Sequence, residues 1–383
     1  MKAVVDGIDE LVSRIKADYK IQMKEEEPLS MNMFTGKSAT GLNGQFVFSQ
    51  VLIDCLLRLK SSDMDNNELI SCCKNEYEGN IPELTKLGEF QEEYSSNKAL
   101  WWYTRDSFFY KILNAALRKQ DARMILLYRS FISDIHRQLQ YHQSKCPVRV
   151  YRSQLMSIDE LVDLKQYIGQ FVSMNSFLST SNERPIALFY MGDKTQPIDL
   201  ERVLFEIEAD PEMVTTKPFA DISMYSCFDS ESEVLFMLGS IFRLNSIIRG
   251  DDQVWIIHMT LCSDDEHDLK QVLTDMKNQN GIGETNLHTL GKLLWNMGKL
   301  DLAEKYYFRL VSELSSNDPL LNKLYAELSK IASQQGDYNK SVQLRKKSLE
   351  IKNQLPPPDI CNKGKRSRAI YIRCSRFENN ACQ

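Results

Sequence analysis

The stretch "DSESEVLF", residues 229–236, places two glutamates two positions apart and then continues directly into apolar residues that favour a strand. Side chains alternate between the two faces of an extended chain, so Glu231 and Glu233 would lie on one side, roughly 6–7 Å apart. Two carboxylates at this distance repel each other. One of them is expected to take up a proton unless a cation or polar group lies beside them. A solvated strand edge shows the same pattern, because charge there discourages pairing with another sheet. The pair indicates chemistry only if suitable partners exist elsewhere in the chain.

The run after this pair is one of several short β-rich runs beyond Pro147, separated by Gly, Pro, Asp and Asn. The others include "VRVYRS", "GQFVSMNSFLSTS", "RVLFEIEA" and "QVWIIHMTLC", with helices predicted at "IDELVDLKQY" and "RPIALFYM". Apolar residues at three- and four-residue spacing predict helices from Phe46 to about Gln143. Helices followed by about five strands predict an α+β domain with an antiparallel or mixed two-sheet core. We place it at residues 46–280 (helical part 46–145, β-rich part 146–265), after a linker at residues 1–45.

The chain becomes helical again from about residue 284, now with an internal repeat. Gly298 aligns with Gly336, and Ala303 with Ser341, at an offset of 38 residues. Helix pairs of this length with Gly at the turn are typical of stacked helical hairpins. The segment resembles tetratricopeptide repeats, with Gly291, Gly298 and Ala303 at small positions of that motif and Tyr307 at an aromatic one. Ser329 and Ser341 depart from it in the second copy. We predict two such repeats at 284–353, binding a protein partner.

Composition limits the classes of protein that fit. The 383 residues are 43% hydrophobic and 26% charged with a net charge of −5, as in a soluble protein without an electrostatic footprint for nucleic acid or an anionic membrane. No secretory signal or membrane-spanning stretch is evident, and nine irregularly spaced cysteines favour reduced thiols, so we expect a cytoplasmic location. His258, Cys262 and His267 are spaced like metal ligands, but no partner cluster of such residues occurs elsewhere in the sequence. We therefore expect no metal site. Six bases in the tail at residues 354–383 could bind nucleic acid, but the absence of periodicity favours a disordered end.

Three stretches of the β-rich part carry the candidate chemistry. Arg152 closes the strand "VRVYRS", and Ser179, Thr180 and Ser181 end the strand in "SFLSTS", where they could also cap the next helix. In the order Arg, Ser-Thr-Ser, Glu-x-Glu, with intervals of 27 (Arg152 to Ser179) and 54 residues (Ser179 to Glu233), they resemble mono-ADP-ribosyltransferases of the arginine-specific R-S-E type. The wider match covers roughly residues 45–265 and includes "YTRDSFFYKILNAALR".

The resemblance implies NAD as co-substrate, without a metal, and a role for each matched residue. Cleaving the bond to nicotinamide builds positive charge on the ribose, as in glycoside hydrolysis, and Glu233 would stabilise that charge. Ser179 would hold the Glu233 carboxylate in place, and Arg152 would offer its planar donors to the pyrophosphate. The residues implied in binding NAD are Tyr151, Arg152, Ser153, Ser179, Thr180 and Ser181.

The resemblance also answers why two glutamates stand together. Glu231 would bind the guanidinium of an acceptor arginine, orient it and take its proton during attack. The incoming cation would then offset the repulsion between the carboxylates. Phe228, in the preceding turn, would pack against the acceptor protein. The implied activity is an NAD-dependent protein-arginine ADP-ribosyltransferase.

One departure from the family leaves alternatives open. The residue after Arg152 is commonly Gly in this family, and here it is Ser153, whose side chain would lower NAD affinity if close approach were needed. An NAD glycohydrolase, which uses water as acceptor, and an inactive scaffold acting through its helical repeats are the alternatives.

Overall fold

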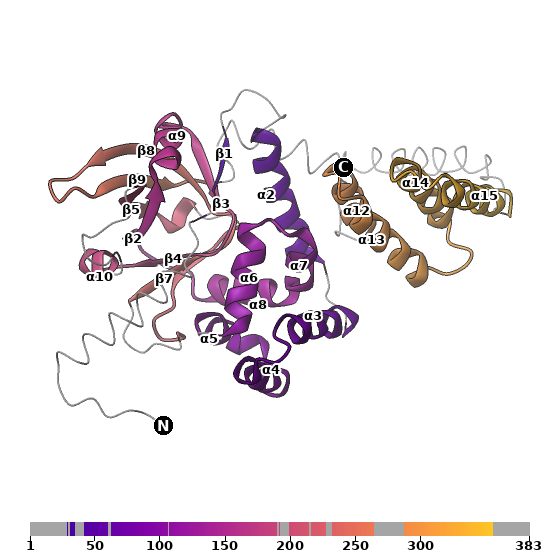
Figure 1. Cartoon of the computed structure of the whole chain (residues 1–383), viewed down its shortest axis with the longest axis horizontal. Coiled ribbons are helices and arrows are strands. Elements are labelled where there is room, and N and C mark those ends of the chain that lie inside the picture. The colour runs from indigo at the N-terminus through magenta and orange to yellow at the C-terminus, as the bar shows by residue number, and fades with distance from the viewer. Residues whose placement is uncertain are drawn as a thin grey trace, which may run out of the picture. The chain divides into compact units, whose positions relative to one another are not determined.

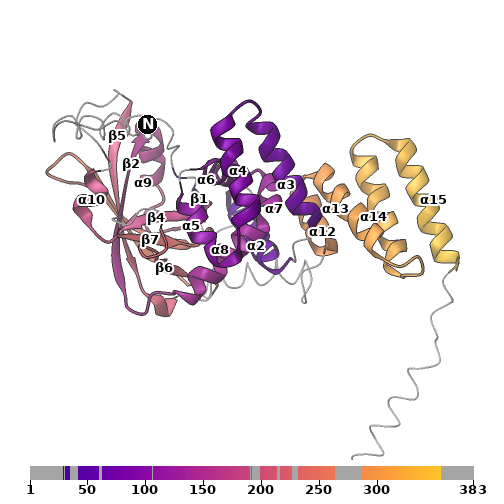
Figure 2. The same cartoon turned by 90° about the horizontal axis from the view of Figure 1, so that it is seen from below.

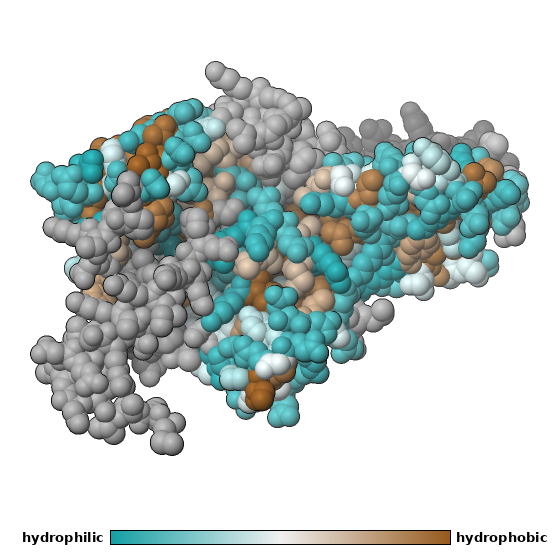
Figure 3. All heavy atoms as spheres, viewed as in Figure 1, coloured by the Kyte–Doolittle hydropathy of each residue, from teal (hydrophilic) through white to brown (hydrophobic). Residues whose placement is uncertain are grey.

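The computed structural model describes residues 29, 31–34, 42–59, 63–105, 107–189, 191, 199–213, 216–226, 232–263 and 287–354. The chain divides into two compact units, residues 1–293 and residues 294–383 (Figure 1). Within the described ranges, no helix has the length and apolar character needed to cross a membrane. Hydrophilic side chains cover most of the described surface in the view of Figure 3.

Helices occupy most of residues 42–141 of the first unit, as the spacing of apolar residues predicted. Side-chain caps start two of them: the Asn80 side chain accepts a hydrogen bond from the Glu83 amide, and Asp121 accepts from the amides of Arg123 and Met124. In Figure 2 these helices form a layer beside the sheet. They are α2 (Leu42–Arg58), α3 (Asp63–Glu76), α4 (Ile81–Glu93), η1 (Ser96–Lys98), α5 (Ala99–Thr104), α6 (Phe108–Arg118), α7 (Ala122–Leu127) and α8 (Arg129–Tyr141).

Aromatic side chains hold this helical layer together. The Phe90 ring stacks on Phe109 with centroids 4.3 Å apart and meets Trp102 edge-on at 5.1 Å. Phe109 meets Phe131 edge-on at 4.4 Å, so rings from α4, α5, α6 and α8 share one contact network. Edge-on and offset arrangements are the favourable ones for aromatic rings. The tryptophan cluster therefore serves packing, with Trp102 fully buried.

The described strands form one mixed sheet of nine strands in the order β1-β3-β8-β9-β5-β2-β4-β7-β6. Neighbours are antiparallel except β5 and β9, which are parallel. The strands are β1 (Met31–Phe34), β2 (Val148–Ser157), β3 (Phe171–Met174), β4 (Leu178–Ser181), β5 (Leu200–Ala209), β6 (Phe219–Asp221), β7 (Glu233–Phe236), β8 (Ile241–Arg249) and β9 (Trp255–Leu261). Two predicted helices lie between strands as expected, α9 (Ile158–Lys165) and α10 (Arg184–Phe189).

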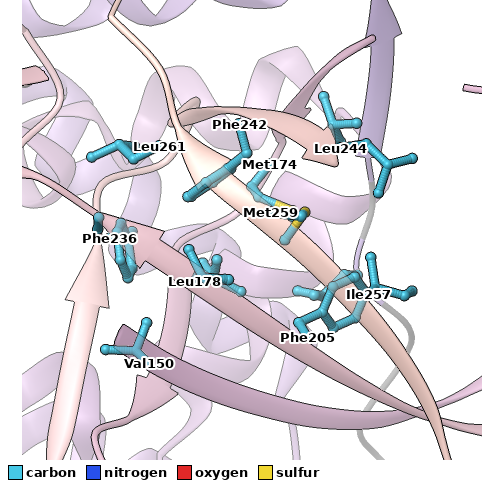
Figure 4. Packing of buried hydrophobic residues seen from close by; sticks show 14 of the residues in the cluster. Val150, Met174, Leu178, Phe205, Phe236, Phe242, Leu244, Ile257, Met259 and Leu261 are labelled. Atoms are coloured by element: carbon cyan, nitrogen blue, oxygen red, sulfur yellow. The ribbon is translucent and has the colours of Figure 1, made fainter. Parts of the chain in front are cut away.

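The predicted α+β class is confirmed. The expected separation into two sheets is not found among the described strands. Strand β2 pairs with β5 along its whole length and with β4 through one residue pair, Tyr151 and Ser181, so one sheet continues through that narrow link. Both ends of the sheet still contribute to a single apolar core, as expected for two facing layers. Figure 4 shows Leu178 and Phe236 from one end packed with Phe242 and Met259 from the other.

Part of the segment interpreted as a linker belongs to the fold. Residues 31–34 form β1, which pairs in register with β3 from Met31 opposite Met174 to Phe34 opposite Phe171. Phe34 is buried, and its ring lies 5.2 Å from that of Phe46 in α2. The polar sequence around β1 hid it, because a four-residue strand carries too little periodicity to stand out.

Residues 287–354, which include the described part of the second unit, form helical hairpins. Helix α12 (Leu287–Asn296) precedes α13 (Leu300–Glu313), and α14 (Leu320–Gln334) precedes α15 (Tyr338–Gln354). Gly298 and Gly336 occupy the two corresponding turns with φ of +72° and +85°. Only glycine adopts this conformation without steric cost, which explains the repeat of glycine at these positions.

Polar contacts join the two hairpins and the helices within them. The Trp295 indole donates to Gln334 Oε1 at 2.6 Å, and Lys340 Nζ lies 2.6 Å from Glu304 Oε1. Ser341 donates to the Ser329 carbonyl oxygen at 2.8 Å. The two serines that depart from the repeat motif thus face each other between α14 and α15, and their bond replaces close packing of small residues.

The turn at Gly336 provides a test of this backbone requirement. Added side-chain atoms at Gly336 would meet no heavy atom within 4 Å, so its substitution isolates the effect of backbone conformation. We expect Gly336→Ala to lower the free energy of unfolding of this unit by about 1 kcal/mol, because left-handed backbone costs an L-residue about 1–2 kcal/mol. Thermal and urea unfolding followed by circular dichroism measure the change. Gly336→Asn should lower the free energy of unfolding less than Gly336→Ala, since Asn tolerates left-handed backbone better. Equal stability of the alanine variant and the parent would contradict the expectation.

Candidate active site

The central feature of the site is a hydrogen bond between two adjacent strands. Strands β4 and β7 are antiparallel, with Ser181 opposite Glu233 and Ser179 opposite Leu235. Side chains two positions apart share a face, so Ser179 lies diagonally across from Glu233. The Ser179 hydroxyl donates to Glu233 Oε1 at 2.6 Å. Both side chains are partly buried, whereas Leu178 and Val234 on the opposite face enter the apolar core.

Arg152 comes to the same place from β2. Its Nη1 donates to the Ser179 carbonyl oxygen at 2.9 Å, which ties the guanidinium to the strand end that carries the serine. Its Nε is buried and has no hydrogen-bond partner among the described residues. The structure thus brings together Arg152, Ser179 and Glu233, which the sequence placed in separate motifs.

The neighbours of Arg152 along β2 point to the other face of the strand. Tyr151 packs against a small apolar cluster that includes Ala187 of α10. The Ser153 hydroxyl donates to the Ala187 carbonyl oxygen at 2.5 Å. The serine that stands where the family commonly has glycine therefore uses its side chain to hold α10 against the sheet. Tyr151 and Ser153 accordingly do not share a face with the Arg152 guanidinium.

The remaining hydroxyls of the Ser-Thr-Ser motif have local partners. Thr180 is buried on the core face and donates to the Val234 carbonyl oxygen at 2.7 Å, which supports the pairing of β4 with β7. Ser181 accepts from the Glu183 amide at 3.1 Å, just before α10. The contact stabilises the turn that leads into α10, but it does not cap the amides of the first helical turn, as the sequence had suggested for this motif.

A short segment after β6 holds the backbone of Glu233. The Ile222 amide donates to the Glu233 carbonyl oxygen at 2.8 Å, and the Glu233 amide donates to Ser223 Oγ at 3.0 Å. The Ser223 hydroxyl in turn donates to Asp221 Oδ1 at 2.5 Å. Sequence reasoning missed this support, because "DIS" at 221–223 resembles any turn.

Tyr103 of α5 is a second residue that sequence reasoning did not single out. Its hydroxyl donates to Asn114 Oδ1 at 3.3 Å, and its ring lies 5.0 Å from that of Phe177, just before β4. Burial is the largest cause that raises the pKa of Tyr103 well above its ordinary value; Glu233 raises this pKa further, and Arg152 lowers it. The phenol therefore stays neutral and close to both charged groups, within the stretch "YTRDSFFYKILNAALR" that carried the wider resemblance.

Two predicted residues lie outside the described residues, namely Phe228 and Glu231.

Among the described residues, no group of His, Cys, Asp and Glu could hold a metal ion. His258 Nδ1 lies 3.9 Å from Glu206 Oε1, and Cys262 is buried in β-sheet surroundings, while His267 is outside the described residues. The described arrangement can present an oriented carboxylate and a planar guanidinium to a ligand that carries both a cationic centre and anionic groups.

Comparison with known protein families finds one match, in the second unit and the residues before it. The tetratricopeptide repeat model matches residues 285–312, which include α12 and most of α13. This match confirms the first of the two predicted repeats. No curated protein matches the chain.

Solved structures similar to this one are ADP-ribosyltransferases. Vis toxin from Vibrio splendidus is 18% identical, with 55% of this chain and 90% of that chain covered and a TM-score of 0.34. Plx2a, a toxin from Paenibacillus larvae, is 18% identical, with 52% and 97% covered and a TM-score of 0.33. HopU1 from Pseudomonas syringae pv. tomato is 16% identical, with 53% and 99% covered and a TM-score of 0.37. The likeness is distant, and it carries no argument about the reaction of this chain.

Proposed function

We propose that this chain transfers ADP-ribose from NAD to arginine side chains of proteins. The observation that carries the proposal is the hydrogen bond from Ser179 to Glu233 at 2.6 Å, next to the Arg152 guanidinium bound to the Ser179 carbonyl oxygen. A solvated strand edge, the alternative for a lone glutamate, would leave the carboxylate exposed and mobile. Here the carboxylate is partly buried, and its rotamer is held by a serine that lies 54 positions away in the sequence.

The described residues fit NAD in both charge and hydrogen bonding. Arg152 has five N–H donors, of which one is used on Ser179, so donors remain for a pyrophosphate.

Each residue of the proposed site has a separate task. Glu233 stabilises the positive charge that develops on the ribose as nicotinamide leaves, and it does so without reorganising because Ser179 already holds it. Ser179 and Ser223 position the carboxylate and the backbone of Glu233, respectively. Glu231, two residues earlier, binds the acceptor guanidinium and takes its proton as the new bond to the ribose forms.

The first prediction concerns the carboxylate itself. Glu233→Gln should lower NAD hydrolysis and transfer to agmatine together by at least about 10²-fold, since both need the same charge stabilisation. Nicotinamide release and ribosylated agmatine, measured by chromatography, give the two rates. Glu208→Gln on β5 is the matched control, because that glutamate is exposed and pairs with Arg149. Loss of only one of the two activities in Glu233→Gln would contradict a shared role.

The second prediction concerns the hydroxyl that holds the carboxylate. Ser179→Ala should lower kcat about 10- to 100-fold and change the KM for NAD little, because it releases the Glu233 rotamer without removing the charge. Initial rates at varied NAD concentration separate the two constants. Ser240→Ala is the matched control: this buried serine donates to the Met237 carbonyl oxygen, and its loss should cost about 1 kcal/mol of stability without lowering kcat. A large rise in KM with kcat unchanged in Ser179→Ala would place the hydroxyl in binding instead.

The third prediction separates arginine transfer from NAD hydrolysis. Glu231→Gln should keep nicotinamide release within about twofold and lower the yield of ribosylated agmatine by at least about 10²-fold, because water needs no carboxylate to bind it but a guanidinium does. The ratio of the two products is the measurement. An equal fall in both products would refute the division of tasks between Glu231 and Glu233, and a parent chain that yields no ribosylated agmatine but releases nicotinamide is a glycohydrolase.

A further inference from the structure

A cleft of about 380 Å³ opens where the end of α8 meets the segment that follows β6. Aromatic rings form one wall: the His142 ring lies 4.1 Å from that of Tyr225 and 4.8 Å from that of Tyr141, nearly perpendicular to the latter. Arg137 and Gln138 lie on the same helix, about one turn earlier, and Ser96 and Asn97 of η1 complete the lining. These residues lie outside the Arg, Ser-Thr-Ser and Glu-x-Glu motifs, and no role was predicted for any of them.

The cleft is tied to the strand that carries Glu233. Gln143, just after α8, accepts from the Phe219 amide at 3.1 Å through its side chain, and the Ser144 amide donates to the Phe219 carbonyl oxygen at 3.1 Å. Phe219 belongs to β6, which pairs directly with β7. Tyr225 lies two residues beyond Ser223, whose Oγ accepts from the Glu233 amide. Two residues span at most about 7 Å between their Cα atoms, so the cleft lies close to the strand end that carries Glu233.

The side chains around the cleft have the character of a protein-binding surface. Tyr141 is 85% exposed, and Met224, next to Tyr225, is 90% exposed. Exposed apolar residues are ordinary when single, but a group of aromatic residues with an arginine and a methionine is typical of interfaces.

Charge decides which partner group fits. The Arg137 side chain is 67% exposed and pairs with Asp134 on the preceding turn of α8. Among the described residues that line the cleft there is no carboxylate. One bond to Asp134 leaves most of the five N–H donors of the guanidinium available for a carboxylate from outside.

We propose that this cleft binds an acidic side chain of the acceptor protein, on the same segment that presents the target arginine to the site at Glu233. The inference rests on the proposed function and adds to it a preference for arginines with a glutamate or aspartate nearby. Because the cleft adjoins the strand end that carries Glu233, the acid should lie within a few residues of the arginine in the acceptor.

The experiment uses the full chain, NAD and three acceptors. These are agmatine, a peptide with one arginine and a glutamate four residues away, and the same peptide with glutamine in place of that glutamate. The parent chain should modify the glutamate peptide with a kcat/KM about fivefold higher, as expected for one partly exposed charged contact. Arg137→Gln should bring the two peptides within twofold and leave agmatine unchanged. Arg123→Gln is the matched control, since that arginine is 58% exposed, pairs with Glu68 and lies outside the cleft.

Binding of labelled peptides, followed by fluorescence anisotropy, keeps the test independent of turnover. Arg137→Glu should reverse the order and favour a peptide with lysine in place of the glutamate. Equal kcat/KM and equal affinity of the two peptides in the parent chain, or a preference that survives in Arg137→Gln, would overturn the proposal. If no acceptor is modified, the proposed function fails, and the anisotropy measurements alone then decide whether the cleft selects acidic peptides.

Discussion

The pairing of β4 with β7 is the constraint on which the candidate site depends. Antiparallel register sets Ser181 opposite Glu233 and leaves Ser179 within hydrogen-bond distance of the Glu233 carboxylate. The opposite face of the same two strands supplies Leu178, Val234 and Phe236 to the apolar core. A slip of one residue would expose those apolar side chains, so burial of the core holds the polar pair in place. The stability of the sheet and the geometry of the site thus have one origin.

Support for this pair comes from two directions. Arg152 binds the end of β4 from β2, and Ser223 binds the backbone of Glu233 from the segment after β6. The helical layer is itself rigid, because aromatic rings from four of its helices pack on one another. A carboxylate held from several rigid elements needs little reorganisation when charge develops beside it, which is the property that an ADP-ribosyl transfer site requires.

The departures from family patterns have local explanations. Ser153, in place of a common glycine, bonds to the carbonyl oxygen of Ala187 and holds α10. Ser341, in place of a small apolar residue, bonds to the Ser329 carbonyl oxygen between two repeat helices. In both cases the hydroxyl donates a hydrogen bond to a backbone carbonyl oxygen. Such a bond satisfies a polar group that would otherwise be buried at a cost.

The sequence by itself determined the kinds of element and several of their ends. Helical periodicity before residue 143, strand-forming runs after it and glycine at both hairpin turns are local properties, and local properties can be read from neighbouring residues. It also supplied the residue types and order that resemble a known family. Only the tertiary structure decided that Arg152, Ser179 and Glu233 meet, that Tyr151 and Ser153 face away from the guanidinium, and that residues 31–34 form an edge strand. The reason is that these facts depend on strand register between segments far apart in the chain, and a shift of one residue in register reverses the face of every side chain without changing the local pattern.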